Sequence, residues 1–535
     1  MVVIKEDKEL LKDDIGEHYC RKFFDFSEVI GYSIEEDESS IRIELNPDRP
    51  DLFSFYSLKE AIKTYYDNNF KLKGIIDRSE ISIIPDVEVL NERPYLLAFE
   101  ARGKKIGHLF NHIIEYQERL HDSIGKSRKK VSIGIHDLKK IKPPFIYKME
   151  ERTKLKFTTY DNFTGTAEDI MHTHEKGIEF KSLIASKNKV PVILDSENDV
   201  LSMPPVINGI KSKVTEETEH FFFDITGTDY NAARNAFYLF AYEMSYMGYK
   251  ISICDSGMKS GNMSSLLGYD FREFDINNSA IKNLMGIKID DPVTLLRKMG
   301  YRCEISHNGY KVNVPGNRID VMGPVDIVED IAKSYGYKNI DEKQIDIYRT
   351  GNPYYKNDQI KTARDIMISI NYQEVKTFVV NSKSFYDNLN YSGSVSIQNP
   401  KSLDYSVIRD SLLPGMLDLI RINKRRKLPI KIFEIGEVIV GGKQITKLCA
   451  LFTNSRASYS DIFQVLNYLN KRILNKSLKI KANEHPEIIE GRGGNILLME
   501  SNIGIIGEVN PIILEQYGIT NPISFLEIRL DSLFE

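Results

Sequence analysis

Acidic residues gather near residue 330, and their spacing could bind a metal ion. Asp326, Glu329 and Asp330 are spaced i, i+3 and i+4, so that all three carboxylates project from one face of a helix. Asp320 precedes this helix by about a turn and a half and can approach the same point. Oxygen ligands without a nearby His or Cys suit a hard cation, and magnesium commonly takes one or two carboxylates plus water.

A solvated acidic helix face is the competing interpretation of the same residues. Arg318 and Lys333 lie close in the sequence and would then be ordinary ion partners of the acids. Spacing alone favours this second interpretation, because charged runs on helices usually face water. A metal site therefore needs support from outside the spacing.

Cysteine and glycine patterns exclude several other chemistries. The four cysteines are widely scattered and form no Cys-x-x-Cys pair, which indicates neither a zinc site nor a disulfide framework and fits a reducing cytoplasm. Neither a P-loop nor a dinucleotide-binding glycine fingerprint occurs. The four positions are Cys20, Cys254, Cys303 and Cys449.

Composition indicates a folded protein of several domains. The chain has 535 residues, of which 41% are hydrophobic and 28% charged, with a formal net charge of −4. This balance excludes nucleic-acid binding over most of the surface and leaves room only for local basic patches. The first residues carry no apolar signal core, and no stretch approaches the ~18 apolar residues of a membrane span. We expect a cytoplasmic protein without a membrane association.

The elements that must position these residues fall into four predicted domains. Residues 1–90 predict a small α+β domain, with an alternating strand at 41–45, a proline-rich turn and a helix that Asp51 or Ser54 could cap. Residues 91–268 predict a mixed domain that begins with an amphipathic helix whose apolar positions run from Leu109 to Ile124.

Residues 269–347 predict a winged-helix-like module. Asp291-Pro292 begins a helix, and Asn308-Gly309 marks a hairpin between two short strands. Residues 348–535 predict a large, mainly antiparallel sheet with flanking helices. The predicted fold class is therefore α+β and multidomain.

Several segments together resemble one known family. The chain is similar, in the same order and over nearly its whole length, to phenylalanyl-tRNA synthetase β subunits of the archaeal and eukaryotic-cytosolic type. Any one segment is weak, whereas six in order make coincidence very improbable. The segments are IELNPDRPDLFS, RKKVSIGIHDL, LSMPPVING, FDITGTD, VPGNRIDV with DIVEDIAKSYGY, and SVIRDSLLPGML with FEIGEV.

Because of this resemblance, a metal site becomes the favoured interpretation of the acids near residue 330, in place of a solvated helix face. It implies magnesium bound by Asp320, Asp326, Glu329 and Asp330, at a site completed by the α subunit. It also implies an (αβ)₂ heterotetramer that joins L-phenylalanine to tRNA(Phe) with ATP. The winged-helix-like module would then carry the magnesium ligands.

The resemblance further implies a proofreading pocket in residues 91–268. A hydrophobic pocket rejects an analogue that merely adds a hydroxyl only ~10²-fold, so hydrolysis of mischarged tyrosyl-tRNA(Phe) in a second site is chemically sensible. By motif match, Ser202, Asn208, Asp224 and Thr226 would line it. Turn and cap roles for these residues remain open. His136 could act as a base there, although a hydrogen-bonded structural histidine is favoured.

The last domain resembles a class II synthetase fold without its chemistry. An active version places an arginine directly before the acid of one strand, whereas Phe433 precedes Glu434 here. Arg529 near the end lacks the glycine pattern that would accompany a second arginine. Because nucleotidyl transfer depends on positioned cations, the α subunit must supply the synthetic active site. The alternatives are a stand-alone tRNA-editing or tRNA-binding protein, and a scaffold without catalysis.

Overall fold

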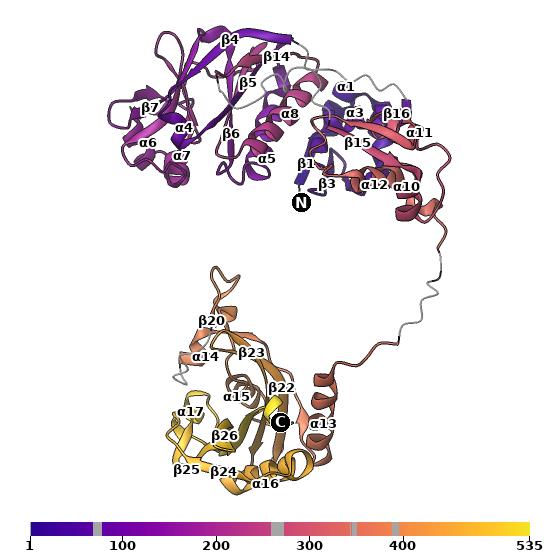
Figure 1. Cartoon of the computed structure of the whole chain (residues 1–535). Helices are drawn as coiled ribbons and strands as arrows, with labels where there is room; N and C mark the ends of the chain where they lie inside the picture. The colour runs from indigo at the N-terminus through magenta and orange to yellow at the C-terminus, as the bar shows by residue number, and fades with distance from the viewer. Residues whose placement is uncertain are drawn as a thin grey trace. The chain divides into compact units, whose positions relative to one another are not determined.

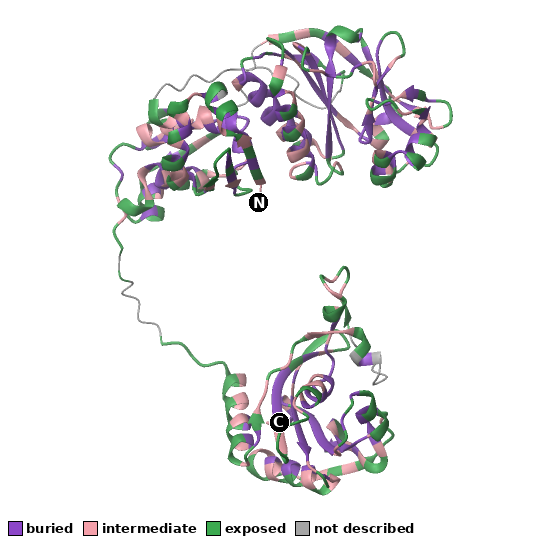
Figure 2. Ribbon diagram, turned by 180° about the vertical axis from the view of Figure 1, so that it is seen from behind, coloured by how far each residue is buried: buried purple, intermediate pink, exposed green. Residues whose placement is uncertain are grey.

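The computed structural model describes residues 2–67, 77–257, 272–342, 344, 350–387 and 395–534 (Figure 1). It divides into two compact units, Met1–Gln344 and Ile345–Glu535. The predicted boundaries at 268 and 347 lie outside the described residues. In each unit the central strands of the largest sheet are mostly buried, whereas many of the helices carry exposed residues (Figure 2).

The first unit begins with a three-stranded antiparallel sheet of order β1-β3-β2, with helices beside it. The predicted strand, turn and helix are present, and Ser54 is the residue that caps the helix. Its Oγ accepts hydrogen bonds from the backbone N–H groups of Tyr56 (3.0 Å) and Ser57 (3.3 Å). The elements are β1 (Val2–Asp7), α1 (Lys8–Ile15), α2 (Glu17–Ile30), β2 (Ser33–Glu36), β3 (Ser40–Leu45) and α3 (Phe55–Asp67).

A nine-stranded sheet of order β12-β11-β10-β7-β4-β14-β5-β13-β6 forms the middle of the first unit. Its first strand in the chain, β4 (Asp77–Pro85), pairs with β14 and β7. The sheet domain therefore starts before the predicted boundary at residue 90. The other strands are β5 (Tyr95–Arg102), β6 (Val131–Asp137), β7 (Phe145–Glu151), β10 (Lys189–Leu194), β11 (Val200–Met203), β12 (Ile207–Asn208), β13 (His220–Gly227) and β14 (Lys250–Asp255).

Alternation along β13 gives this sheet its two different faces. Phe221, Phe223 and Ile225 belong to the large core, in which Phe223 stacks on Phe99 at a centroid distance of 4.4 Å. Helices α5 (Phe110–Asp122) and α8 (Tyr230–Tyr246) contribute to the same core, as the predicted apolar stripe from Leu109 requires. Phe222 belongs to a separate cluster, because successive residues of a strand point to opposite faces.

Smaller elements complete this part of the unit. A two-stranded sheet and two short helices pack a third cluster near β10, β11 and β12. They are β8 (Lys156–Thr158), β9 (Thr164–Thr166), α6 (Ala167–Thr173) and α7 (Glu175–Phe180), with α4 (Val89–Glu92) elsewhere.

The winged-helix-like module follows, and its turns form as predicted. Asp291 accepts a hydrogen bond from the N–H of Thr294 (3.1 Å) at the start of α11. Strands β16 and β17 pair from Ser306 and Gly309 outward, so His307 and Asn308 form the two-residue turn. The elements are β15 (Arg272–Asn277), α10 (Asn278–Met285), α11 (Pro292–Lys298), β16 (Arg302–Ser306), β17 (Gly309–Val314) and α12 (Pro324–Tyr335).

The second unit is a seven-stranded sheet of order β18-β22-β23-β27-β26-β25-β24, antiparallel except between β18 and β22. Its two faces carry separate cores, so both are covered, and the predicted antiparallel sheet is confirmed. The strands are β18 (Gln373–Glu374), β22 (Ile430–Val440), β23 (Lys443–Thr453), β24 (Leu478–Ala482), β25 (Ile488–Leu498), β26 (Ser501–Val509) and β27 (Ile523–Arg529).

Helices flank this sheet, and a small three-stranded sheet lies apart from it. No described helix has the length and apolar character needed to span a membrane. The helices are α13 (Tyr355–Ser369), α14 (Lys383–Asp387), α15 (Leu413–Ile422), α16 (Tyr459–Leu469) and α17 (Pro511–Gln516), and the small sheet consists of β19 (Val380–Asn381), β20 (Val395–Ser396) and β21 (Val407–Ile408).

Candidate functional site

The acids predicted to bind magnesium do not converge on one point in this chain. Asp330 is buried, and its Oδ2 accepts hydrogen bonds from Arg318 and from the hydroxyl of Tyr301, both at 2.5 Å. Arg318 also donates to both oxygens of Asp320, at 3.0 and 2.8 Å. One buried guanidinium therefore holds two of the four predicted ligands.

The other two acids lie at the surface of α12. Asp326 Oδ2 accepts hydrogen bonds from the backbone N–H groups of Met322 (2.7 Å) and Gly323 (2.9 Å), which closes the first turn of the helix. Glu329 is half-exposed and pairs with Lys333 at 3.1 Å. These two carboxylates are the ones that a cation or a partner chain can reach.

Asp320 also connects the winged-helix-like module to the N-terminal sheet domain. Asp320 lies 3.9 Å from Arg49, which itself forms a bidentate pair with Asp51. Burial would raise the pKa of Asp320, but the charge and hydrogen bonds of Arg318 and the charge of Arg49 lower it to about 2. This carboxylate is therefore an ionised partner of two arginines.

The residues predicted to line a proofreading pocket lie around the polar face of β13. Asp224 is buried, and its Oδ2 accepts a hydrogen bond from Ser202 (3.1 Å) and contacts Nε2 of His136 at 2.7 Å. The other ring nitrogen of His136 contacts Ser212 Oγ at 2.8 Å. His136 thus has the hydrogen-bonded structural role that the sequence favoured, and Ser212 is a member that no sequence motif marked.

A glycine on the neighbouring strand leaves the space that the side chain of Asp224 occupies. Gly134 of β6 pairs with Asp224 across the sheet. A Cβ at residue 134 would lie only 2.1 Å from Asp224 Oδ2, so no larger residue fits there without displacing the carboxylate. The glycine of VSIGIHDL is therefore part of the site's geometry.

A cavity of about 410 Å³ adjoins this cluster, and Asn208 and Ser212 are among its walls. Ser202 and Asp224 reach it only through the chain of contacts from Asp224 to His136 and Ser212. Thr226 is held elsewhere, by Arg93 (2.9 Å) and Ser132 (3.1 Å). The structure thus brings Ser202 and Asp224 into contact, places Asn208 on the cavity wall, and directs Thr226 to a buried arginine.

A basic loop at the cavity edge has unusual backbone geometry. Lys126, Ser127 and Arg128 follow one another with φ values of 51°, 51° and 63°. Left-handed backbone costs roughly 1–2 kcal/mol for each such residue and persists only where surrounding contacts enforce it. Arg128 supplies those contacts, because it donates to the carbonyl oxygens of Pro205 (3.3 Å) and Val206 (3.1 Å) and pairs with Glu118 (2.9 Å).

Electrostatics around Arg128 are equally well defined. Burial would raise the pKa of Glu118, but the hydrogen bond and charge of His121 and the charges of Arg128 and Lys176 lower it to about 2. Burial lowers the pKa of His121, whose Nε2 accepts a hydrogen bond from the N–H of Ile133 at 2.8 Å. Glu118 is therefore an ionised anchor for the loop.

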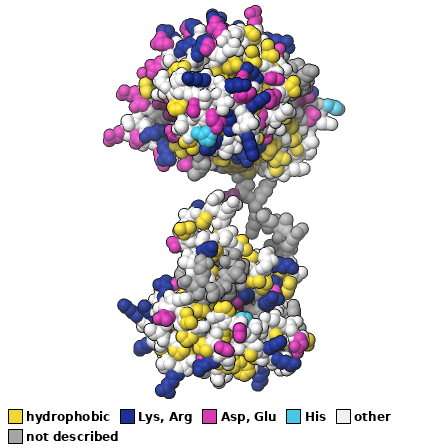
Figure 3. Space-filling model, turned by 90° about the vertical axis from the view of Figure 1, so that its left-hand side faces the viewer, with side chains coloured by type: hydrophobic (Ala, Val, Ile, Leu, Met, Phe, Trp, Pro, Cys, Tyr) yellow, Lys and Arg dark blue, Asp and Glu magenta, His cyan; other side chains and the backbone are white. Residues whose placement is uncertain are grey.

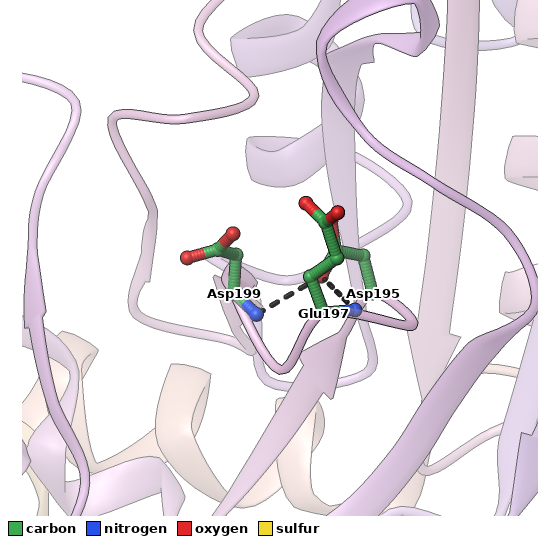
Figure 4. A group of neighbouring side chains, drawn as sticks. All are labelled: Asp195, Glu197 and Asp199. Atoms are coloured by element: carbon green, nitrogen blue, oxygen red, sulfur yellow. Dashed lines mark hydrogen bonds between the residues drawn. The ribbon is translucent and has the colours of Figure 1, made fainter.

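Three further acids lie together in the turn between β10 and β11, as Figure 4 shows. Among the described residues, Asp195, Glu197 and Asp199 are the one group of three potential ligands within 4.8 Å of one another. Asp195 Oδ1 accepts hydrogen bonds from the N–H groups of Glu197 and Asp199, both at 2.9 Å, and Lys211 pairs with all three acids. The group is a hydrogen-bonded turn whose three acids share one lysine, and Lys142 also pairs with Glu197.

In the second unit, the acid of β22 is already paired. Glu434 is fully buried and accepts a hydrogen bond from Arg409 (2.8 Å), while Thr377 donates to its other oxygen (2.7 Å). Phe433, the residue before Glu434, lies in the core. The strand has no arginine, and its one cation, Lys431, lies over the rings of Tyr372 and Phe452.

Comparison with known proteins identifies the three larger parts of the chain. Residues 89–243 match the B3/4 domain, residues 274–337 the tRNA synthetase B5 domain, and residues 344–530 the phenylalanyl tRNA synthetase beta chain CLM domain. These domains together define a subunit of an aminoacyl-tRNA synthetase.

Relatives that align over their full length identify the aminoacyl-tRNA synthetase to which such a subunit belongs. The phenylalanine–tRNA ligase beta subunits of Thermoplasma volcanium and Thermoplasma acidophilum are 42% and 40% identical, and each alignment covers 100% of this chain and at least 98% of the relative. An N-terminal fragment of the Pyrococcus horikoshii phenylalanyl-tRNA synthetase β-subunit has a TM-score of 0.57 at 28% identity, covering 62% of this chain and 99% of the fragment. The chain belongs to the family of phenylalanine–tRNA ligase β subunits.

Replacing Arg318 tests its role at the junction of the first unit. Arg318→Met leaves the carboxylates of Asp320 and Asp330 without their main partner, so we expect the free energy of unfolding to fall by about 3–5 kcal/mol. Lys338→Met removes an exposed pair with Glu28 and should cost less than ~1 kcal/mol. Urea unfolding followed by far-UV circular dichroism measures both, and equal effects would contradict the assignment.

The lowered pKa of Glu118 predicts a defined pH dependence. Because its folded pKa of about 2 lies below the ordinary value of 4.5, its contribution to stability is complete above about pH 4.5 and is lost as the pH falls toward 2. Melting temperatures of the wild-type protein and Glu118→Gln should therefore differ most near neutral pH and converge as the pH falls from about 4.5 toward 2. A difference that stays constant over that range would show that ionised Glu118 does not anchor the loop.

Proposed function

We propose that this chain acts in a phenylalanine–tRNA ligase whose α subunit carries the synthetic active site. The complex joins L-phenylalanine to tRNA(Phe) with ATP. The observation that carries this division of labour is the buried Glu434–Arg409 pair behind Phe433, which leaves β22 without a phosphate-binding arginine. We place the assembly, an (αβ)₂ heterotetramer, in the cytoplasm, in keeping with four buried free cysteines.

A stand-alone editing or tRNA-binding protein is not favoured. Such a protein would need only residues 89–243, whereas the relatives align over the whole chain. A scaffold without catalysis would not need the polar chain from Ser202 to Ser212 beside a cavity. We therefore retain two activities for the complex, aminoacylation and proofreading.

Proofreading is assigned to the cavity between α5, β6 and β12. At about 410 Å³ it has the size of a small-molecule site and could enclose the aminoacyl end of a mischarged tRNA. Asn208 and Ser212 present polar groups to it, and Asp224 holds His136, which in turn holds Ser212. In this scheme Asn208 and Ser212 recognise the tyrosyl ester or orient a water molecule, and Asp224 with Ser202 positions them.

Substitutions at the cavity wall test this assignment. In the complex assembled with its α subunit, Asn208→Ala and Ser212→Ala should each slow hydrolysis of tyrosyl-tRNA(Phe) about tenfold, the effect of losing one hydrogen bond of about 1.4 kcal/mol. Aminoacylation with phenylalanine should not change. Asp224→Asn, which keeps the side-chain shape, should give the same separation. Hydrolysis at the wild-type rate in all three variants would refute the proofreading assignment.

Magnesium binding is the second part of the proposal. The carboxylates suit a hard cation, but only Asp326 and Glu329 are accessible, whereas Asp320 and Asp330 would join the ligand set only on displacement of Arg318. We therefore assign Asp326 and Glu329 as the residues that would hold the ion, together with groups of the α subunit. The ion would supply positive charge where α12 meets the α subunit.

The effect of Mg²⁺ on the melting temperature of the complex distinguishes the two acids that would hold the ion from the two that pair with Arg318. Glu329→Gln and Asp326→Asn should weaken the rise in melting temperature that added Mg²⁺ produces, and should lower aminoacylation. Asp320→Asn and Asp330→Asn should destabilise the chain with and without Mg²⁺, because they break contacts to Arg318. An unchanged response to Mg²⁺ in the first pair, with normal activity, would remove the metal site from the proposal.

A further inference from the structure

Basic side chains on the loop between α5 and β6 are available at the surface. Lys126 and Lys129 are exposed, and neither has an ion pair in the part of the chain that the structure describes. Lys130, by contrast, pairs with Asp229 at 2.9 Å. On the face of the first unit drawn in Figure 3, basic and acidic side chains are intermixed. With an overall charge of −4, two neighbouring unpaired lysines on one turn are a local feature and not a general excess.

The loop lies at the edge of the proofreading cavity. Arg128 is one of the cavity's lining residues, and so are Lys176 and Lys213. The one acid among the lining residues, Glu118, is already paired with Arg128. The charged residues that line the cavity therefore sum to a positive charge, although Lys176 also pairs with Glu179 at 3.3 Å and the interior is formed largely by apolar side chains such as Ile133 and Val206.

The backbone holds these lysines in place before any ligand arrives. Its left-handed residues are fixed by Arg128 and by hydrogen bonds from Lys129 N–H to Lys126 O (3.2 Å) and from Lys130 N–H to Gly125 O (2.8 Å). On the far side, Thr228 donates through its N–H to Lys130 O (2.9 Å) and through Oγ1 to Lys129 O (3.1 Å). A fixed loop loses little conformational entropy on binding, so its charges act efficiently.

We propose that Lys126 and Lys129 bind backbone phosphates of the single-stranded 3′ end of tRNA while its aminoacyl group occupies the cavity. The inference rests on the proofreading function proposed above and adds the residues that dock the substrate. An aminoacyl group enters a cavity only if the polyanionic strand attached to it passes over the edge, and that edge carries unpaired cations. Lys176 and Lys213 extend the same positive rim around the cavity.

The test uses the full heterotetramer with Lys126→Ala/Lys129→Ala. Removing two phosphate contacts should raise the KM for tyrosyl-tRNA(Phe) hydrolysis roughly tenfold with little change in kcat. The slope of log KM against log salt should fall by about 1.4, at ~0.7 for each contact with a single strand. Aminoacylation with phenylalanine should stay at the wild-type rate, because that reaction uses the α subunit's site.

The control is Lys104→Ala/Lys250→Ala. Lys104 lies two residues after Arg102 and Lys250 pairs with Arg102 across the sheet, at the opposite end of β5 from the loop. Both lysines are exposed, so the same charge is removed far from the loop, together with one surface ion pair between Lys250 and Asp77. The control should leave KM and the salt slope unchanged. Equal changes in both double variants, or none in the loop variant, would overturn the docking proposal.

A second measurement works even if the enzyme proves unable to proofread. A tRNA with a photoreactive nucleotide next to its 3′-terminal adenosine should crosslink to residues 125–130 in the wild-type complex and lose that crosslink in the loop variant. Absence of hydrolysis with this crosslink present would refute proofreading but keep the docking surface. Persistence of the crosslink in the loop variant, or its displacement by an acidic peptide such as polyglutamate but not by excess tRNA, would refute the docking surface.

Discussion

The alternation of side chains along β13 is the constraint on which the first unit depends. Its odd-numbered positions place Phe221 and Phe223 in the core that α5 and α8 also build. Its even-numbered positions place Phe222 and Asp224 on the other face, next to His136 of β6. Both faces of β13 are buried, and a shift of one residue in the pairing would place the carboxylate among phenylalanines and turn those rings toward His136, so the core fixes the register of the polar cluster.

Buried charge is arranged in the same way at two distant places. Arg318 satisfies Asp320 and Asp330 inside the first unit, and Arg409 satisfies Glu434 inside the second. In both, a guanidinium with several fixed donors meets a buried carboxylate, Asp330 or Glu434, which is the geometry that makes a buried pair tolerable. The consequence differs, however. At Arg318 the pairing holds Asp320, which also lies 3.9 Å from Arg49 of the N-terminal domain, whereas at Arg409 it holds an acid within the sheet of the second unit.

Local patterns in the sequence predicted the fold well where the chemistry is local. The cap at Asp291, the turn before Gly309 and the alternating strand before Leu45 all formed as expected, because each depends on a few adjacent residues. The assignment of β4 was not predictable from its own residues, since its partners β7 and β14 lie far along the chain. The same limit applies to the site. Motif matches found Ser202 and Asp224, but not Ser212, which reaches them only through His136.

The acids near residue 330 show why spacing cannot assign ligands by itself. The i, i+3, i+4 pattern correctly placed Asp326, Glu329 and Asp330 on one helix, but the buried side of that helix belongs to Arg318 and Tyr301. Adjacent residues of the helix thus differ in role, because Asp330 is buried against Arg318 whereas Glu329 faces water.

Arg128 shows the same division between structural and accessible charge for cations. Arg128 pairs with Glu118 and donates hydrogen bonds to two carbonyl oxygens, which fixes the loop. The neighbouring Lys126 and Lys129 have no ion pair among the described residues. Under the docking proposal, the charge of Arg128 stabilises the loop and the charges of Lys126 and Lys129 are left for the partner molecule.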